Sequence, residues 1–259
     1  MPTPSAAPAP RSAAIPEGAT KISPAQDSHP PILHSGEFDK PIPMEGPINT
    51  PGAEDSPFIS PDGSMFFFFF TPDVDVPPEG QLLDGVTGLY LSRRTDQGWT
   101  QPERILLQDE GELALDGCGF FDGQTLWFCS AREGYTGVQW FQADLFDNRW
   151  TNWRPADFDP SYEVGELHIY DDELYFHSNR DGGRGGMDLW LSVKEEGGWG
   201  IPRNLGRLNT EASEGYPFVT ADGNELWFTR WYQGAPALYR SIRIEDEWSE
   251  PEIIVSQFA

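Results

Sequence analysis

A repeat of about fifty residues runs through most of this 259-residue chain. Four tryptophans recur at separations of 51, 49 and 49 residues: Trp99, Trp150, Trp199 and Trp248. About ten residues before each of them stands a further aromatic residue: Tyr90, Trp140, Trp190 and Tyr239. A fixed period of this length indicates tandem structural units that pack against their neighbours. The sequence therefore predicts a repeat architecture.

Each unit also contains an acidic turn followed by an apolar run. The turns lie at residues 61–63, 122–123, 171–172 and 222–223, and the runs at 65–70, 126–128, 174–176 and 226–228. The chain has 27 glycines and 24 prolines, and this much turn chemistry argues against long helices. Four short strands per unit, joined by tight turns, are typical of a propeller blade. We therefore predict an all-β fold, a β-propeller of four-stranded blades.

The units do not account for the whole chain. Residues 1–28 are rich in proline and alanine and are expected to form a disordered leader or linker, which leaves residues 29–259 for the propeller. Four complete repeats begin near Asn49. Three of the periodic tryptophans, Trp99, Trp199 and Trp248, are followed three residues later by a proline. The segment from Phe38 to Pro41 repeats this aromatic-x-x-Pro spacing and predicts an N-terminal outer strand without its own inner strands. This favours a five-bladed plan with an incomplete fifth blade, whose open edge would favour self-association.

Charge and composition exclude several classes of partner. The chain has 42 acidic and 17 basic residues and a formal net charge of −25, which speaks against nucleic acid and anionic membranes. No apolar run approaches the roughly 20 residues of a membrane-spanning helix, and no signal peptide is recognisable, so we expect a soluble protein. A periplasmic or extracellular location and a cytoplasmic one both stay open.

Cys118 and Cys129 fall on neighbouring strands of one hairpin, where a disulfide and two free thiols are both compatible with the sequence.

Two sequence segments resemble a known family. Ser60-Pro61-Asp62-Gly63, followed by an apolar strand, resembles the Pro-Asp-Gly repeat of the WD40-like propellers of the TolB group. Residues 178–190 are similar to a loop and third strand of those repeats. The resemblance covers residues 36–259, although the second unit lacks the proline and the third lacks both proline and glycine. It implies a non-catalytic scaffold that binds a ligand or another protein.

Aligning the units brings charged residues into register at one end of the blades. The first two strands of a blade form an antiparallel hairpin, so the start of the first and the end of the second lie on the same face. We expect this face to line the mouth of the central channel, where loops converge on a rigid scaffold. The candidate ligand-binding residues are Glu54, Asp55, Asp116, Arg132, Glu166, His177, Arg180, Glu214 and Arg230.

Two interpretations of these nine candidate residues stay open. In one, the carboxylates and arginines pair with one another and fasten adjacent blades. In the other, they bind a small polar ligand, a glycan or a protein segment, with Tyr135, Tyr216, Trp231 and Tyr232 available to stack on a sugar. The sequence assigns no cofactor and no metal ligands, with a divalent cation such as calcium as a variant of the polar site.

A second resemblance suggests an enzyme. Five-bladed glycoside hydrolases of the arabinanase and xylosidase type carry an Asp before Pro in the first blade, an Asp in the second and a Glu-Gly-Pro segment further on. By this resemblance Asp55 is the general base, Glu214 the general acid and Asp116 the residue that tunes the acid's pKa. Ser56 and Tyr216 interrupt the family spacing, and Glu214 falls in the fourth unit rather than the third.

Overall fold

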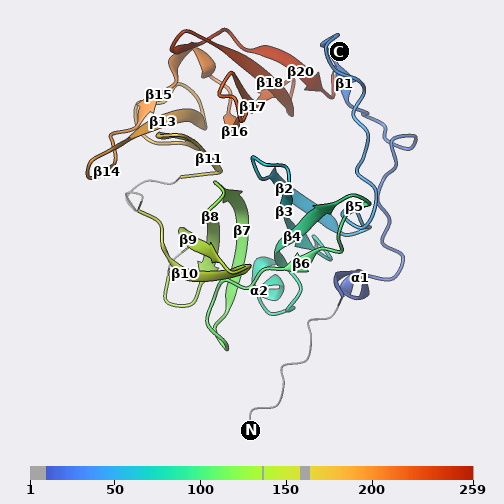
Figure 1. Ribbon diagram of the computed structural model, residues 1–259. Coiled ribbons are helices and arrows are strands. Elements are labelled where there is room, and N and C mark those ends of the chain that lie inside the picture. The colour runs from blue at the N-terminus through green and yellow to red at the C-terminus, as the bar shows by residue number, and fades with distance from the viewer. Residues whose placement is uncertain (1–9, 136, 158–163, 259) are drawn as a thin grey trace. The chain divides into compact units, whose positions relative to one another are not determined.

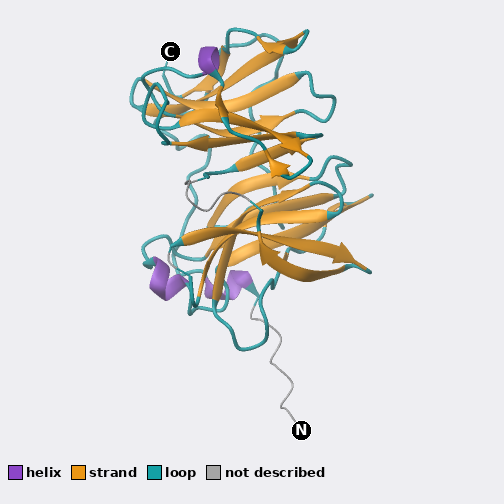
Figure 2. Cartoon of the chain, turned by 90° about the vertical axis from the view of Figure 1, so that its left-hand side faces the viewer, coloured by secondary structure: helices purple, strands orange, loops and turns teal. Residues whose placement is uncertain are grey.

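The computed structural model describes residues 10–258 except residues 136 and 158–163. Strands make up nearly all of the regular structure (Figure 2). The chain divides into two compact units, which are Met1–Ile22 with Pro43–Ala156 (unit 1) and Ser23–Ile42 with Asp157–Ala259 (unit 2). Each unit contains two antiparallel sheets, and the four sheets are the blades of a β-propeller.

No helix among the described residues has the length and apolar character that crossing a bilayer requires.

Blade 1 belongs to unit 1 and is built on a phenylalanine-rich strand. Its strands run in the order β2 (Ala53–Ile59), β3 (Met65–Thr71), β4 (Gly88–Thr95) and β5 (Gly98–Trp99), and β6 (Glu103–Arg104) also pairs with β4. The run of phenylalanines in β3 has high β propensity and is almost entirely buried. A short helix α2 (Pro78–Gln81) interrupts the connection from β3 to β4, and α1 (Arg11–Ala14) lies in the N-terminal segment (Figure 1).

Blade 2 completes unit 1 and has the simplest topology. Its strands β7 (Ala114–Phe121), β8 (Thr125–Arg132), β9 (Val138–Phe146) and β10 (Arg149–Pro155) pair in sequence order. Phe121 pairs with Leu126 at the turn end of the β7–β8 hairpin. The register then shifts by one residue between Gly117 and Phe120, so that Cys129 lies opposite Gly117 and Cys118 occupies a bulge. Cys118 and Cys129 nevertheless form a disulfide, with their Cα atoms 5.4 Å apart.

Unit 2 contains blades 3 and 4. Blade 3 consists of β11 (Leu167–Tyr170), β12 (Glu173–Ser178), β13 (Asp188–Glu195) and β14 (Gly198–Trp199), with β15 (Arg203–Asn204) also paired to β13 and a 3₁₀ turn, η1 (Gly206–Leu208), after it. Blade 4 consists of β16 (Glu214–Val219), β17 (Glu225–Tyr232), β18 (Ala235–Ile244) and β20 (Glu252–Ser256), with β19 (Glu247–Trp248) paired to β18. In all four blades the first two strands along the chain pair with one another as an antiparallel hairpin, as predicted from the repeat.

The acidic turns join the first and second strands of each blade, as predicted. In blade 1 the hydroxyl of Ser60 and the backbone N–H of Ser64 both donate to Asp62 Oδ1, at 2.6 and 3.0 Å. These hydrogen bonds stabilise the carboxylate and lower the pKa of Asp62. Gly63 has a φ of +71°, a left-handed conformation that suits glycine. The acidic residue thus satisfies the turn's backbone donors, which explains its recurrence in the sequence.

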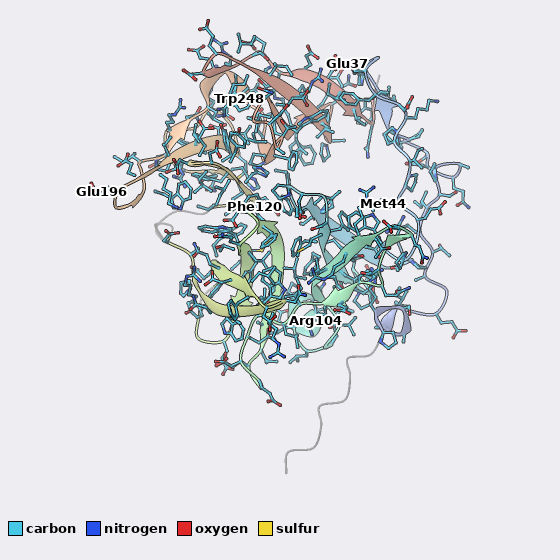
Figure 3. All side chains as sticks on the ribbon, in the orientation of Figure 1. Glu37, Met44, Arg104, Phe120, Glu196 and Trp248 are labelled. Carbon is cyan, nitrogen blue, oxygen red and sulfur yellow. A yellow bond between two sulfur atoms is a disulfide. The ribbon has the colours of Figure 1, made fainter. Side chains whose placement is uncertain are left out.

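Two of the periodic tryptophans, Trp150 and Trp248, join neighbouring blades within their units. In unit 1, Trp150 lies edge-on to Phe121 of its own blade and Phe67 of blade 1, with ring centroids 5.5 and 6.1 Å apart. In unit 2, Trp248 packs on Tyr175 of blade 3 at 6.1 Å and belongs to the core shared by blades 3 and 4 (Figure 3). Aromatic contacts of this kind combine a large buried area with a defined ring geometry. At Trp150 and Trp248 the fifty-residue period thus places a ring against the preceding blade, whereas Trp99 packs on Phe66 of its own blade at 5.5 Å.

The N-terminal outer strand exists, but it does not lie where the sequence analysis placed it. Residues 34–52 contain no strand, and the added strand is β1 (Ile32–Leu33), which pairs with β20 at the edge of blade 4. Phe38 instead packs edge-on against Trp227 at 5.4 Å, and Glu37 forms an ion pair with Arg240 at 2.7 Å. The segment therefore docks on blade 4 by side chains, because its prolines lack the N–H groups that strand pairing requires. The described residues form no fifth blade.

Candidate functional site

The nine predicted site residues are divided between the two units. Glu54, Asp55, Asp116 and Arg132 belong to unit 1, and Glu166, His177, Arg180, Glu214 and Arg230 belong to unit 2. Most of them lie where the first strand of a blade begins and the second strand ends, as expected from the hairpin geometry.

Blade 4 shows the arrangement most clearly. Arg230 Nε donates to Glu214 Oε1 at 2.8 Å, and Arg230 Nη2 donates to the carbonyl of Leu208 at 2.8 Å. The guanidinium carbon lies 4.6 Å from the centroid of the Tyr239 ring, within the range of a cation–π interaction. The hydroxyl of Thr210 also donates to Glu214 Oε1 at 2.6 Å, and the Glu214 side chain has no solvent exposure. We call this combination of arginine, carboxylate, carbonyl and aromatic rings an arginine clamp.

Blade 2 contains a second arginine clamp. Arg132 Nη2 donates to Asp116 Oδ1 at 3.2 Å and to the carbonyl of Leu107 at 2.8 Å, and its guanidinium lies 4.2 Å from the centroid of Phe141. Burial raises the pKa of Asp116, whereas the hydrogen bonds from Ser130 and Arg132 favour its charged form. A buried carboxylate of this kind depends on its partner, because removing the cation leaves an uncompensated charge.

In blade 1 the clamp is completed by a residue that the sequence analysis did not select. Arg11 Nη1 donates to Glu54 Oε1 at 3.0 Å, and Arg11 Nη2 donates to the carbonyl of Ile48 at 2.7 Å. The hydroxyl of Thr50 donates to the same Glu54 oxygen, as Thr210 does to Glu214 in blade 4. One signal pointed to an outside partner, since Phe70 lies opposite Glu54 where blade 4 has Arg230 opposite Glu214.

Blade 3 departs from this pattern. Arg180 stacks on Phe176 at 4.6 Å, and its Nε donates to the hydroxyl of Ser178 at 3.1 Å. The carboxylate of Glu166, in contrast, faces His177, with 3.6 Å between Oε2 and Nε2, and 28% of the Glu166 side chain is exposed. Blade 3 therefore brings a partly exposed acid beside an imidazole.

His177 is held in one neutral form. The backbone N–H of Tyr216 donates to Nδ1 at 3.2 Å, which places the imidazole proton on Nε2, toward Glu166. Burial lowers the pKa of His177 to about 4 despite the nearby carboxylate. Gly165 makes room for the ring, because a Cβ atom there would lie 1.9 Å from Nε2. The histidine thus links the first strand of blade 4 to blade 3 as a fixed acceptor.

The inner strands of blades 1, 2 and 4 share a bulge with a left-handed residue. Ser56, Cys118 and Tyr216 have φ values of +48°, +51° and +55°, and each lies in the interval where the strand register shifts. Such bulges redirect side chains and strengthen the local twist. At Tyr216 the bulge leaves 57% of the residue exposed, and in the same blade Trp231 is 53% exposed. Asp55, beside the bulge of blade 1, is exposed and accepts a hydrogen bond from the N–H of Ser56 at 2.7 Å.

The other aromatic candidates have different surroundings. Tyr135 is exposed in unit 1 and packs edge-on against Phe141 at 5.3 Å, whereas Tyr232 packs partly buried against the unit 2 core. Among the described residues, no three His, Cys, Asp or Glu side chains gather closely enough to hold a metal ion.

The chain is similar in fold to several solved structures. They include TolB from Acinetobacter baumannii (15% identity, TM-score 0.45, covering 78% of this chain and 43% of that one) and an endo-arabinase from Bacteroides thetaiotaomicron VPI-5482 (14%, 0.49, 78% and 81%). A puromycin-hydrolyzing peptidase from Mycobacterium tuberculosis is also similar (13%, 0.40, 77% and 38%). The chain thus spans less than half of the TolB and peptidase chains.

No protein-family model and no curated protein sequence matches the chain. At these identities the structural similarities concern the fold alone. The four antiparallel blades themselves make this chain a β-propeller protein.

Proposed function

We propose that the chain is a non-catalytic binding module whose ligand contacts unit 2 at Tyr216 and Glu166. The observation that carries this proposal is the imidazole of His177, which accepts the backbone N–H of Tyr216 and faces the partly exposed carboxylate of Glu166. An exposed aromatic ring and a partly exposed carboxylate that both contact His177 suit a small polar ligand, a glycan or a protein segment, because the ring offers a stacking face and the acid an acceptor.

The other predicted site residues have different roles in this proposal. Asp116 with Arg132, Glu214 with Arg230, and Glu54 with Arg11 hold strands within the units, since each carboxylate is almost fully enclosed. Arg180 and His177 position the blade 3 end of the site. Asp55 lies on unit 1 and is not part of the unit 2 site.

The enclosure of Glu214 supports a binding module over a glycoside hydrolase. A general acid must reach the leaving oxygen of the substrate. The carboxylate of Glu214 is enclosed by Arg230 and Thr210 and has no solvent exposure, so this side chain is poorly suited to that role.

A glycan array and a metabolite panel, followed by thermal shift, test the proposal. A ligand that raises the melting temperature of the wild type should lose at least tenfold in affinity with Tyr216→Ala and with Glu166→Gln. Tyr135→Ala, which removes an exposed tyrosine from unit 1, is the matched control and should bind normally. Equal affinity of all three variants would overturn the proposed site. Hydrolysis of aryl arabinosides or xylosides that is lost in Asp55→Asn would overturn the non-catalytic assignment.

A further inference from the structure

Blade 1 contains a slot for an arginine side chain, lined by Glu54, Phe68, Phe70 and Tyr90. The arginine that fills this slot does not come from the strands of blade 1. In blade 4, Glu214 pairs across the hairpin with Arg230, which supplies the guanidinium of the clamp. The corresponding pair in blade 1 is Glu54 with Phe70. Blade 1 therefore has the carboxylate and the aromatic rings of an arginine clamp, while the cation comes from elsewhere.

The cation comes from the N-terminal segment. The guanidinium carbon of Arg11 lies 5.1 Å from the ring centroid of Phe68, 5.0 Å from that of Phe70 and 5.9 Å from that of Tyr90. All three distances fall within the reach of cation–π attraction. Arg11 also donates to the carbonyls of Pro47 and Ile48 and is 8% exposed. The slot thus satisfies the guanidinium by charge, by hydrogen bonding and by stacking.

Other side chains of the N-terminal segment contact blade 1 around the slot. Ala14 and Ile15 pack against the apolar cluster around Phe68, and Lys21 donates to Glu54 Oε2 and to Asn49 Oδ1. An arginine followed three and four residues later by alanine and isoleucine matches this surface.

The segment that carries Arg11 is held differently from the other clamp arginines. Arg132 and Arg230 belong to β8 and β17, so they cannot leave their clamps without disrupting a blade. Arg11 lies in a helix of four residues, too short to be stable by itself. The backbone hydrogen bonds shown for residues 10–22 are local, from Ala13 to Pro10 and from Ala19 to Pro16. The side chains of this segment therefore provide its attachment to blade 1.

We propose that blade 1 carries an arginine-recognition site, formed by Glu54, Phe68, Phe70, Tyr90 and the carbonyls of Pro47 and Ile48, and that residues 10–22 are its exchangeable internal occupant. The competing ligand is an arginine-bearing peptide segment with the pattern Arg-x-x-Ala-Ile. Because the site lies in unit 1 and uses other residues, this proposal is independent of the unit 2 binding site.

Peptide binding to the full-length chain tests the proposal. The probe is a fluorescein-labelled peptide of residues 10–22, and the recipient is Arg11→Ala, which empties the slot. This variant should bind the peptide at least tenfold more tightly than the wild type, whose own Arg11 competes. A peptide with citrulline in place of arginine keeps the shape but lacks the charge, and should bind at least tenfold more weakly. Adding Glu54→Gln to the recipient should reduce binding of the arginine peptide to a similar extent.

The matched control is Arg132→Ala, which removes from blade 2 a guanidinium that its own strand β8 provides. It should not gain affinity for the peptide. Equal binding of the arginine and citrulline peptides, or equal binding by the two alanine variants, would overturn the proposal.

A second measurement covers the case in which Arg11→Ala does not fold. In wild-type protein, a saturating excess of the arginine peptide should increase hydrogen exchange of the resident amides 11–15 at least fivefold, and the citrulline peptide should not. Unchanged exchange with both peptides would identify the segment as a permanent part of blade 1 and refute the exchange.

Discussion

The buried histidines of unit 2 make its stability sensitive to acid. Burial lowers the pKa of His177 from 6.5 to about 4 and that of His168 from 6.5 to about 3. Between pH 6.5 and these values, the unfolded chain binds a proton at each histidine that the folded chain does not bind. Stability is therefore fully present above pH 6.5 and falls as the pH decreases. At Nδ1 of His177 a proton would face the backbone N–H of Tyr216, which explains why the folded chain resists protonation there.

The size of the effect follows from the displacement of the pKa. A full displacement of about 2.5 pH units for His177 corresponds to about 3 kcal/mol, of which about 2 kcal/mol is lost between pH 7 and pH 5. His168 should add about 2 kcal/mol over the same interval, since neither folded pKa has yet been reached.

Urea unfolding at pH 7 and pH 5, followed by tryptophan fluorescence, measures this loss. His177→Asn is the appropriate variant because its amide oxygen can accept the Tyr216 N–H without titrating. The variant should lose about 2 kcal/mol less than the wild type between the two pH values. The many carboxylates of the chain contribute equally to both proteins and cancel in the comparison. The same pH dependence in wild type and variant, within about 0.5 kcal/mol, would refute the assignment of a buried neutral histidine.

Three further predictions concern the contacts that hold the blades. Arg230→Ala should lower the free energy of unfolding by about 3–5 kcal/mol in urea, because it leaves a buried carboxylate unpaired; a loss below about 1 kcal/mol would contradict the clamp. Mass spectrometry should find Cys118 and Cys129 linked, and reduction should destabilise unit 1 by about 2–3 kcal/mol through the entropy of the closed loop; two free thiols in protein purified under oxidising conditions would be the contrary result. Gly165→Ala should cost at least about 1–3 kcal/mol because its methyl group meets His177, whereas Gly197→Ala, which has open space around it, serves as the control and should change little.

Much of the blade architecture was predictable because it depends on local, periodic features of the sequence. Strand interiors such as residues 65–70 are recognisable by continuous apolar runs, and the turn at Asp62 by its acidic residue and glycine. The equivalence of Glu54 and Glu214 was also visible in the sequence, since a threonine stands four residues before each of them. These features depend on neighbours in the chain, so they can be inferred without knowing the tertiary fold.

The strand near the N-terminus shows where such inference fails. The Phe38 segment carries the spacing of an outer strand, yet β1 forms at Ile32–Leu33, and Phe38 contributes a ring contact instead. Spacing reports which side chains occupy equivalent places, whereas pairing also requires free backbone donors. The prolines after Phe38 remove those donors, and the pattern alone does not weigh their effect.

The repeat, the four-stranded blades, the acidic turns and the recurring carboxylates all follow from the order of residues along the chain. The partner of each carboxylate, in contrast, depends on how the chain folds. The tertiary structure pairs Glu54 with Arg11, 43 residues away, and leaves Glu166 beside His177 with part of its side chain exposed. The physical reason is that periodicity follows from the geometry of one strand and its neighbour, while the partner and the burial of a charge depend on segments that meet only after the chain has folded.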